Sequence, residues 1–564
     1  MAAAGPPSFA LDRGDFTHWG DGRRTISRDD FWALADRYVR IIQAEPRVGA
    51  FALIVAPTSL DMMALFVALI AAGRTASFFP PGSTRQDAEA HAEQQVQAVR
   101  RIKPSSVLLM QGQEGVLGGL DLGGERLALP RLSELPDAAA ADGARARTLF
   151  AQALERTDPL FWQHSSGTTG IKKAVGVSGV ALARQHRSYW PAVAEAVGGG
   201  PVRVASWLPL YHDMGLMAGF LLPLLGGASL AVMDPFDWVD APQRFLEMIE
   251  AQAASVCWMP NFAFRHYTRL RRAMPRRDLG AMRAWISCSE PCRYADAVAF
   301  EESYGVDGVG QGSVLGCYAM AETVFAVSQL GAGGQRALVV GRDLKPGDRV
   351  GGADSFETTS RHPQVGAQMQ AVLSSGAPIA GVRARVFLRG RPVDEEGVYG
   401  EIGLASDFLF PGYRGLAPAQ SNIRPDGFYL TGDLGVILEG ALYVFGRTKE
   451  IVIVNGKNLH VGDVEDRIGA VPGVRPGRAV AFGLDSPALG TEALVVVAER
   501  DAACELTDAD IRAGIVNAIS DAFLVKPYDV RLTRERWLVK TTSGKLSRAK
   551  NKAKYLRDFR SDPA

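Results

Sequence analysis

The sequence predicts an α/β protein in which a large body with parallel sheets and a β subdomain precedes a small α+β domain. Residues 29–44 place apolar side chains at helical spacing, and residues 50–56 form a short apolar run. A second helical segment, 61–73, ends at a glycine and leads to another apolar run at 75–79. Strand, helix and strand at this spacing indicate βαβ units and therefore a parallel sheet. The same alternation returns between residues 203 and 259.

The pattern changes after residue 380 and again after residue 450. Short apolar runs separated by Gly, Pro or Asp predict a mainly β subdomain over about 380–446, and they lie at 382–388, 400–405, 427–430, 434–438 and 441–444. Strands and helices then alternate again, so we divide the chain into a body, 1–446, and a C-terminal domain, 447–564. Residues 331–371 are rich in Gly and charge with little periodicity, which predicts an insertion or a long loop.

Composition excludes several classes of protein. The 564 residues carry 62 Lys and Arg against 61 Asp and Glu, a formal charge of +1, so no single strong field dominates. The hydrophobic fraction of 47% and the charged fraction of 22% are typical of a globular chain rather than a disordered one. Five sparse cysteines fit a reducing cytoplasm, and the first ten residues lack the basic and apolar segments of a signal peptide.

Two stretches raise the question of a membrane or a polyanionic partner. The uncharged stretch 214–233 has the length of a membrane span, but Pro223 and four glycines favour a buried helix and strand. The basic run between 545 and 560 has no interleaved aromatic pattern, so nucleic-acid binding is not expected. That run is either a solvated helix face or a docking site for an acidic carrier protein or CoA phosphates.

The sharpest chemical motif is the loop His-Ser-Ser-Gly-Thr-Thr-Gly-Ile-Lys-Lys at 164–173. Backbone N–H groups and hydroxyls at this density can surround phosphate oxygens, and the lysines add positive charge. The loop is not a Walker A motif, because Ile171 rather than Lys follows Gly170. Its candidate phosphate ligands are Ser165, Ser166, Gly167, Thr168, Thr169, Gly170 and Lys173, with Thr168 also a candidate catalytic group.

Five further motifs place reactive residues at strand ends or in loops. A carboxylate such as Glu322 can hold Mg²⁺ through oxygen, an aromatic such as Tyr318 can stack on a base, and Asp433 suits a ribose diol. Taken singly, each motif is better explained as a core aromatic, a cap or a turn. The motifs are His212-Asp213 after Trp207, Tyr318-Ala319-Met320 with Glu322, Thr431-Gly432-Asp433, Arg447 with Lys449, and Lys545 on a loop.

The order of these motifs over residues 160–550 resembles the adenylate-forming superfamily of acyl-CoA synthetases, nonribosomal peptide adenylation domains and luciferases. Within it, residues 207–216, 260–264 and 289–291 are similar to the fatty acyl-AMP ligase branch. Segment 331–371 falls where those ligases carry an insertion that hinders the second orientation of the C-terminal domain.

The resemblance implies a role for each motif and two cofactors, ATP and Mg²⁺. The loop 165–173 would bind the phosphates of ATP, and Lys545 would enter the site to bind the carboxylate and α-phosphate oxygens. The other implied roles are Ser289, Glu290 and Pro291 beside adenine, Tyr318 with Ala319 and Met320 stacked on it, Glu322 as the Mg²⁺ ligand, Asp433 and Arg447 on the ribose, and Lys449 as the hinge.

The implied substrate pocket contains His212, Asp213, Trp258, Asn261, Cys288 and Cys317. His212 either gates the acyl site near the reacting carboxylate or is a structural histidine bonded to nearby backbone. The bulk of Trp258 favours a shorter acid. Cys288 and Cys292 have a metal-like spacing without the four ligands of a zinc site, so buried thiols are the better interpretation.

Two positions depart from the superfamily pattern. Lys172 stands where a proline is usual, and Ala319 stands where a glycine is usual, which narrows the space beside the nucleotide. The leading hypothesis is a ligase that converts a small-molecule carboxylic acid into an acyl adenylate and pyrophosphate. It then passes the acyl group to an acyl carrier protein or, second, to CoA. Two alternatives stay open: activation of an aryl acid or of nitrite, as in a diazotase that uses an aryl amine, and a degenerate nucleotide-binding scaffold.

Overall fold

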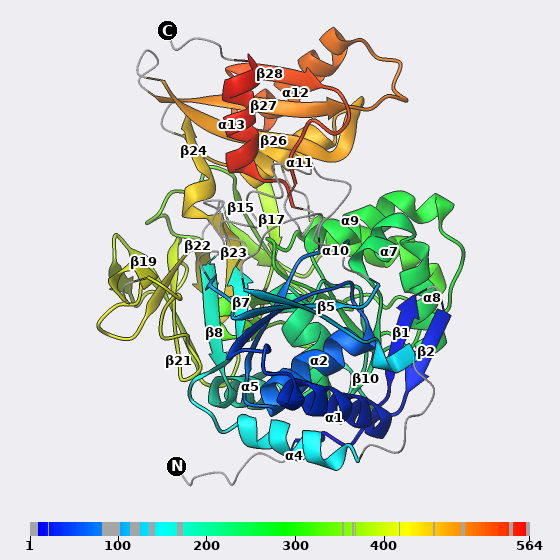
Figure 1. Ribbon diagram of the computed structural model, residues 1–564. Coiled ribbons are helices and arrows are strands. Elements are labelled where there is room, and N and C mark those ends of the chain that lie inside the picture. Colours follow the sequence, from blue (N-terminus) through cyan, green and yellow to red (C-terminus); the bar gives the residue numbers. More distant parts are fainter. Residues whose placement is uncertain are drawn as a thin grey trace.

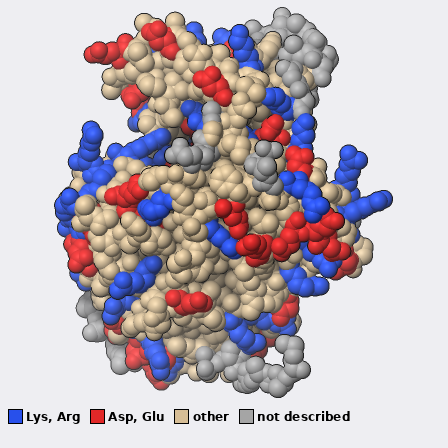
Figure 2. Space-filling model, turned by 180° about the vertical axis from the view of Figure 1, so that it is seen from behind, with Lys and Arg blue, Asp and Glu red and all other residues tan. Residues whose placement is uncertain are grey.

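The chain folds into a large body and a smaller lobe formed by the C-terminal elements (Figure 1). The computed structural model describes residues 9–20, 22–81, 102–112, 115, 124–134, 142–165, 173–351, 355–363, 366, 368–416, 418–454, 457–486, 491–540 and 545–559. Seen from behind, the smaller lobe is set off from the body by a narrower waist, and acidic and basic side chains are interspersed over this face (Figure 2).

Two large sheets form the body. One has the order β6-β5-β3-β4-β7-β8 and the other the order β18-β14-β13-β12-β11-β9-β10-β1-β2. Their central strands pair in parallel, which confirms the predicted α/β class with parallel sheets. The strands are β1 (Phe16–Gly20), β2 (Gly22–Ile26), β3 (Phe51–Val55), β4 (Thr75–Phe79), β5 (Ser106–Met110), β6 (Glu125–Leu129), β7 (Pro159–Ser165), β8 (Lys173–Ser178), β9 (Arg203–Ser206), β10 (Ser229–Val232), β11 (Val256–Met259), β12 (Ala284–Ser287), β13 (Val314–Ala319), β14 (Ala326–Gln329) and β18 (Ala377–Pro378).

Helix α2 (Leu60–Ala71) packs between elements of the two sheets, so that they share one core. All of its residues are buried, and Phe66 stacks on Phe78 of β4 with 4.4 Å between ring centroids. On its other side Phe66 meets Phe220 of the π-helix η3 (Met214–Leu221) at 6.4 Å. The other body helices are α1 (Arg28–Ala44), α4 (Ala144–Ala153), α5 (Gly179–Ala196), α6 (Leu222–Leu225), α7 (Pro235–Asp240), α8 (Gln243–Gln252), α9 (Asn261–Leu270) and α10 (Tyr294–Tyr304).

The stretch 214–233 forms buried η3, α6 and β10, as its breakers predicted. A wholly buried, irregular helix explains why this stretch is apolar on all sides. Within the residues that the structure describes, no helix combines the length and apolar character needed to cross a bilayer.

The predicted β subdomain is a five-stranded sheet of order β20-β19-β21-β22-β23. One detail of the prediction is wrong: runs 427–430 and 434–438 belong to a single strand, whose register against β23 shifts between Leu434 and Gly435. The irregularity interrupts the period-two pattern without ending the strand. The strands are β19 (Val382–Leu388), β20 (Arg391–Val393), β21 (Gly400–Ser406), β22 (Tyr429–Leu438) and β23 (Ala441–Arg447).

Segment 331–371 is more ordered than a long loop. Its described residues supply β15 (Ala337–Gly341), β16 (Phe356–Thr358) and most of β17 (Met369–Leu373), which form a three-stranded antiparallel sheet. Of the two predicted possibilities, an insertion or a long loop, the long loop is therefore wrong for these residues. Short strands separated by polar turns carry too few residues for a clear period.

The C-terminal lobe has its own apolar core, which includes Val464, Ile468, Val496 and Ile515. A β24-β25 hairpin lies beside a β26-β27-β28 sheet, and three helices pack around them. The elements are β24 (Ile451–Val454), β25 (Lys457–His460), α11 (Val461–Gly469), β26 (Val474–Ser486), β27 (Thr491–Arg500), α12 (Asp508–Phe523), β28 (Asp529–Thr533) and α13 (Arg548–Phe559).

Replacing Gly376 with alanine should strongly destabilise the body. Gly376 has a φ of +75°, and a Cβ there would lie 2.0 Å from the carbonyl oxygen of Gln329 on β14. We expect a loss of unfolding free energy of at least about 3 kcal/mol, since a backbone clash adds to the left-handed strain. Gly199→Ala is the matched control, because its φ is +73° and its Cβ would meet open space. Chemical denaturation measures both, and equal losses would contradict the clash.

Candidate active site

Three of the predicted site residues lie at the carboxyl ends of neighbouring parallel strands, β11, β12 and β13. Asn261 follows β11, Ser289 follows β12, and Tyr318 lies at the end of β13. Ligands of open α/β sheets bind outside the carboxyl ends of the strands. The sheet topology therefore brings together motifs that lie far apart in the sequence.

Tyr318, Asp433 and Arg447 form one connected group. The Tyr318 hydroxyl donates to Asp433 Oδ2 at 2.5 Å, and Arg447 Nε donates to Asp433 Oδ1 at 2.9 Å. Burial raises the pKa of Asp433, and the Arg447 guanidinium beside it acts in the opposite direction. The negative charge of Asp433 raises the pKa of Arg447. An aromatic ring joined to an ionised acid and a guanidinium suits a base and a ribose diol.

Glu322 lies in the short turn η6 (Ala321–Thr323) that follows β13, and it is 9% exposed. Its Oε1 accepts a hydrogen bond from Tyr413 at 2.6 Å, and the Tyr413 hydroxyl also lies 3.0 Å from that of Tyr429. The bond from Tyr413 uses Oε1, so Oε2 is the oxygen that could serve a cation. Burial raises the pKa of Glu322. A carboxylate oxygen fits a hard divalent cation such as Mg²⁺ as one of its ligands.

The turn that carries Glu322 is strained. Val324 has a φ of +65°, which is rare for a β-branched residue. The backbone nevertheless holds, because the carbonyl of Val324 accepts from Gln163 Nε2 at 3.2 Å and Phe410 N donates to the carbonyl of Glu322 at 2.8 Å. Strain of this kind persists where surrounding contacts over-determine the conformation, as at functional sites.

Lys545 crosses from the C-terminal lobe into this site. Its Nζ donates to the carbonyl oxygen of Ser289 at 2.6 Å. Ser289 itself has a φ of +67°, which turns that carbonyl away from a regular strand. Burial opposes ionisation of nearby Asp213, but the His212 hydrogen bond and the Lys545 charge hold its pKa below the usual value. Lys545 is therefore placed as a cation beside the strand ends.

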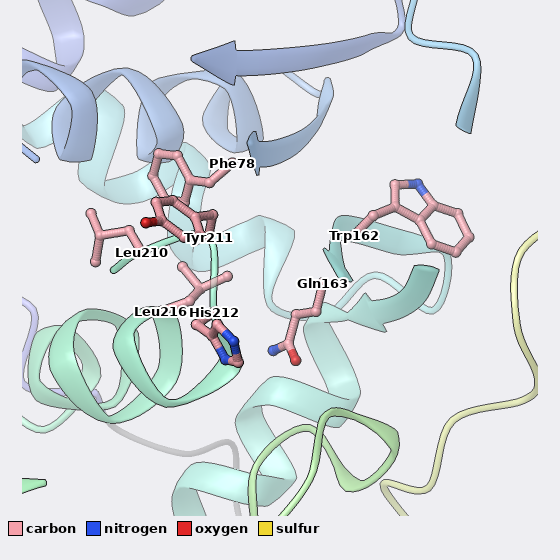
Figure 3. A pocket seen from close by; sticks show the side chains of 7 residues that line it. All are labelled: Phe78, Trp162, Gln163, Leu210, Tyr211, His212 and Leu216. Carbon is pink, nitrogen blue, oxygen red and sulfur yellow. The ribbon is translucent and has the colours of Figure 1, made fainter. Parts of the chain in front are cut away.

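His212 pairs with its neighbour and borders a narrow pocket. Its Nδ1 lies 3.2 Å from Asp213 Oδ1, which also accepts from Met214 N. The pocket has no room for a water molecule and is lined by Phe78, Trp162, Gln163, Leu210, Tyr211, His212 and Leu216. Figure 3 shows Gln163 and His212 approaching each other from β7 and the β9–η3 connection. Gln163 Oε1 is buried without a hydrogen-bond donor among the described residues.

Two of the predicted site residues also fix the loop after β12. Asn261 donates to Asp296 Oδ2 at 2.7 Å and accepts from Arg293 N at 3.0 Å. Glu290 Oε2 accepts from Phe262 N at 3.0 Å, at the start of α9. These bonds hold segment 288–293, which includes Pro291, against the first turn of α9.

The remaining pocket residues are buried and interconnected. Trp258 is 1% exposed and donates to the Tyr189 hydroxyl at 2.9 Å, and Tyr189 donates in turn to Gln329. A hydrogen bond to Cys317 and burial raise the pKa of Cys288, so its thiol stays protonated. All four cysteines near the site are buried and free, and no group of three metal-binding side chains occurs among the described residues.

The phosphate loop can be placed only by its ends. β7 and β8 form an antiparallel hairpin in which Ser165 pairs with Lys173. Lys173 Nζ lies 4.3 Å from the ring centroid of Tyr413, beside Glu322. Ser166, Gly167, Thr168, Thr169 and Gly170 lie outside the described residues. Ala319 ends β13, Met320 is buried, and the expected hinge Lys449 lies in the short turn η8 (Thr448–Glu450).

Sequence patterns missed one residue that shapes the site. Tyr413 joins Glu322, Tyr429 and Lys173 from a segment with no recognisable motif. Its only local signal is the preceding Pro411-Gly412, which marks a turn.

Comparisons with known proteins agree with this geometry. Residues 8–414 match the family model described as AMP-binding enzyme. A putative ligase of Mycobacterium tuberculosis is 32% identical over 70% of this chain and 71% of its own length. JamA of Moorena producens, a medium-chain-fatty-acid–[acyl-carrier-protein] ligase, is 28% identical over 70% of this chain and 67% of its own. A solved structure from a study of fatty acyl-adenylate ligases of E. coli and L. pneumophila superposes with a TM-score of 0.80 at 22% identity, covering 98% and 97% of the chains.

The fold and site define a nucleotide-binding enzyme in which a lysine of a second lobe lies at the strand ends. The chain belongs to the AMP-binding enzymes, and its predicted membership of the adenylate-forming superfamily is confirmed.

Proposed function

We propose that this enzyme activates a carboxylic acid with ATP and Mg²⁺, forming an acyl adenylate and pyrophosphate. The observation that carries the proposal is the delivery of Lys545 to the Ser289 carbonyl, at the strand end next to the Tyr318 group. A scaffold that only bound nucleotide would not need a cation from a second lobe at this position.

The reaction joins two anions, so its barrier depends on positive charge near the oxygens that react. Lys545 would hold the acid carboxylate and an α-phosphate oxygen, while Asp433 and Arg447 fix the ribose end. Mg²⁺ bound at Glu322 would neutralise phosphate charge. Holding both reactants in one geometry lowers the entropic part of the barrier.

For the acceptor, we propose an acyl carrier protein ahead of CoA. Two observations support this order: JamA is named as an acyl-carrier-protein ligase, and segment 331–371 contacts the C-terminal lobe through Arg342 and Asp463. Aryl acids and nitrite gain no support from JamA or from the fatty acyl-adenylate ligase structures.

A panel of acids tests the proposal. We expect acid-dependent exchange of labelled pyrophosphate into ATP with aliphatic acids, and subsequent loading of a holo carrier protein in preference to CoA. Fatty acids of several lengths, aryl acids and nitrite with an aryl amine should be compared. Nucleotide binding without exchange for any acid would overturn the activity, and faster acyl-CoA formation than carrier loading would overturn the acceptor.

A further inference from the structure

Helix α11 joins the C-terminal lobe to the body through a cluster of charged side chains. We name Arg265, Arg293, Asp463 and Asp466 the docking cluster. Arg265 Nη1 lies 2.6 Å from Asp466 Oδ1, and Arg293 Nε lies 3.2 Å from Asp466 Oδ2. Arg293 also forms an ion pair with Asp463. Both acids belong to the C-terminal lobe and both arginines to the body.

The docking cluster is partly shielded from solvent, with Asp463 and Arg293 more buried than Arg265 and Asp466. Side-chain exposure is 2% for Asp463, 16% for Arg293, 27% for Arg265 and 34% for Asp466. Burial opposes ionisation of Asp466, yet the charges of Arg293 and Arg265 hold its pKa below the ordinary value. Ion pairs shielded in this way are screened less by salt than surface pairs. Removing one partner leaves a buried charge without compensation.

On the body side, the cluster is continuous with the loop that receives Lys545. Arg293 ends the segment that starts with Cys288 and Ser289, and Asn261 accepts from its backbone N–H. The Ser289 carbonyl, four residues before Arg293, is the acceptor for Lys545 Nζ. The C-terminal lobe therefore contacts both ends of one short loop, at Ser289 and at Arg293.

On the lobe side, α11 is also linked to Lys545. Between Asp463 and Asp466, Glu465 binds Arg548 with two contacts of 2.9 and 2.6 Å. Arg548 is three residues after Lys545, and its Nη1 also lies 2.7 Å from Glu450 in the hinge turn. One short helix thus connects the body, the hinge turn and the segment that carries the lysine.

A contact from segment 331–371 supports the same interface. Arg342 Nη1 lies 3.9 Å from Asp463 Oδ2, and its guanidinium lies 5.8 Å from the ring centroid of Phe523 on α12. Arg342 therefore adds a third body arginine to the face of α11.

We propose that Asp463 and Asp466 are positioning residues that dock the C-terminal lobe through Arg293 and Arg265 and so set Lys545 at the Ser289 carbonyl. The inference rests on the proposed function for its kinetic consequence only. The docked orientation itself is a property of the ion pairs. Both aspartates contact arginines of the body and act through Lys545.

The structural test uses the double variant Asp463→Asn with Asp466→Asn. Dyes on Arg187→Cys of α5 and Arg512→Cys of α12, both exposed, report the distance between body and lobe in a Cys504→Ser background. Energy transfer between the two dyes falls as they move apart. We therefore expect the double variant to show a new population of molecules with low energy-transfer efficiency. Asp521→Asn, an exposed change on α12, is the matched control and should keep the single docked population. An unchanged distribution in the double variant would overturn the proposal, whether or not any acid is activated.

The kinetic test is a double-mutant cycle with Lys545→Ala. We expect the aspartate changes to lower pyrophosphate exchange by at least about 10-fold, because only the docked fraction reacts. The KM for ATP should stay within about 2-fold of wild type, since Tyr318 and Asp433 belong to the body. In the Lys545→Ala background the same changes should have almost no further effect. A full multiplicative loss in that background would refute positioning through Lys545. Asp466→Asn alone repeats both measurements if the double variant does not fold.

Discussion

Lys545→Ala should lower acid-dependent pyrophosphate exchange by at least about 10²-fold, the usual effect of removing one preorganised donor. The ammonium is the cation from the C-terminal lobe that lies at the strand ends, 2.6 Å from the Ser289 carbonyl. The carbonyl position marks where an anionic oxygen of the acid or the α-phosphate would compete for Nζ. Because this carbonyl is neutral, the resting contact is readily exchanged for a charged ligand.

The fold should survive the change. Lys545 is half-buried in a loop, and α13 starts only at Arg548, which keeps its bonds to Glu465. Thermal unfolding should therefore match wild type, and nucleotide affinity should change little. Lys526→Ala is the control, an exposed lysine of the same lobe. An exchange rate near that of wild type in Lys545→Ala would remove the lysine from the mechanism.

Residues with roles carried by local motifs could be predicted from the sequence. Tyr318 lies near the end of β13 and Asp433 lies inside β22, 115 positions away, and not at a strand end as predicted. Each nevertheless belongs to a recognisable motif, and the fold joins them in one hydrogen bond. The alternation of strands and helices is also visible in local sequence patterns, so the fold class could be predicted from the periodicity of apolar residues. These predictions needed only short-range patterns.

Residues with roles set by tertiary contacts could not be predicted in this way. Tyr413 binds Glu322, and Arg293 binds α11, from segments whose local patterns point only to a turn or a solvated charge. Glu290 and Asn261 stand in motif positions that predict ligand contacts, and their additional bonds to backbone groups and Asp296 were likewise not indicated by any motif. A hydrogen bond to a partner far along the chain produces no periodic pattern in the local sequence.

Glu322→Gln should nearly abolish Mg²⁺-supported activity while raising stability at alkaline pH. The substitution keeps an oxygen that can accept from Tyr413 but removes the charge that would bind the cation. We expect a fall of about 10²-fold in exchange, because a metal ion supplies several kcal/mol of charge stabilisation. Titration with MgCl₂ should show half-saturation at a much higher concentration than in wild type.

The stability change follows from the pKa of Glu322, which burial raises above its ordinary value. The native state therefore binds this proton more tightly than the unfolded state does, so its contribution to stability grows as pH falls. At pH 8 the wild type must keep an ionised carboxylate buried, and glutamine removes that penalty. The variant should unfold at a higher temperature than wild type at pH 8, and the difference should shrink as pH approaches the ordinary glutamate pKa. Glu505→Gln, an exposed change, should show neither effect. A stability gain equal at pH 8 and pH 5.5, with an unaltered MgCl₂ titration, would show that Glu322 neither carries the buried charge nor binds the cation.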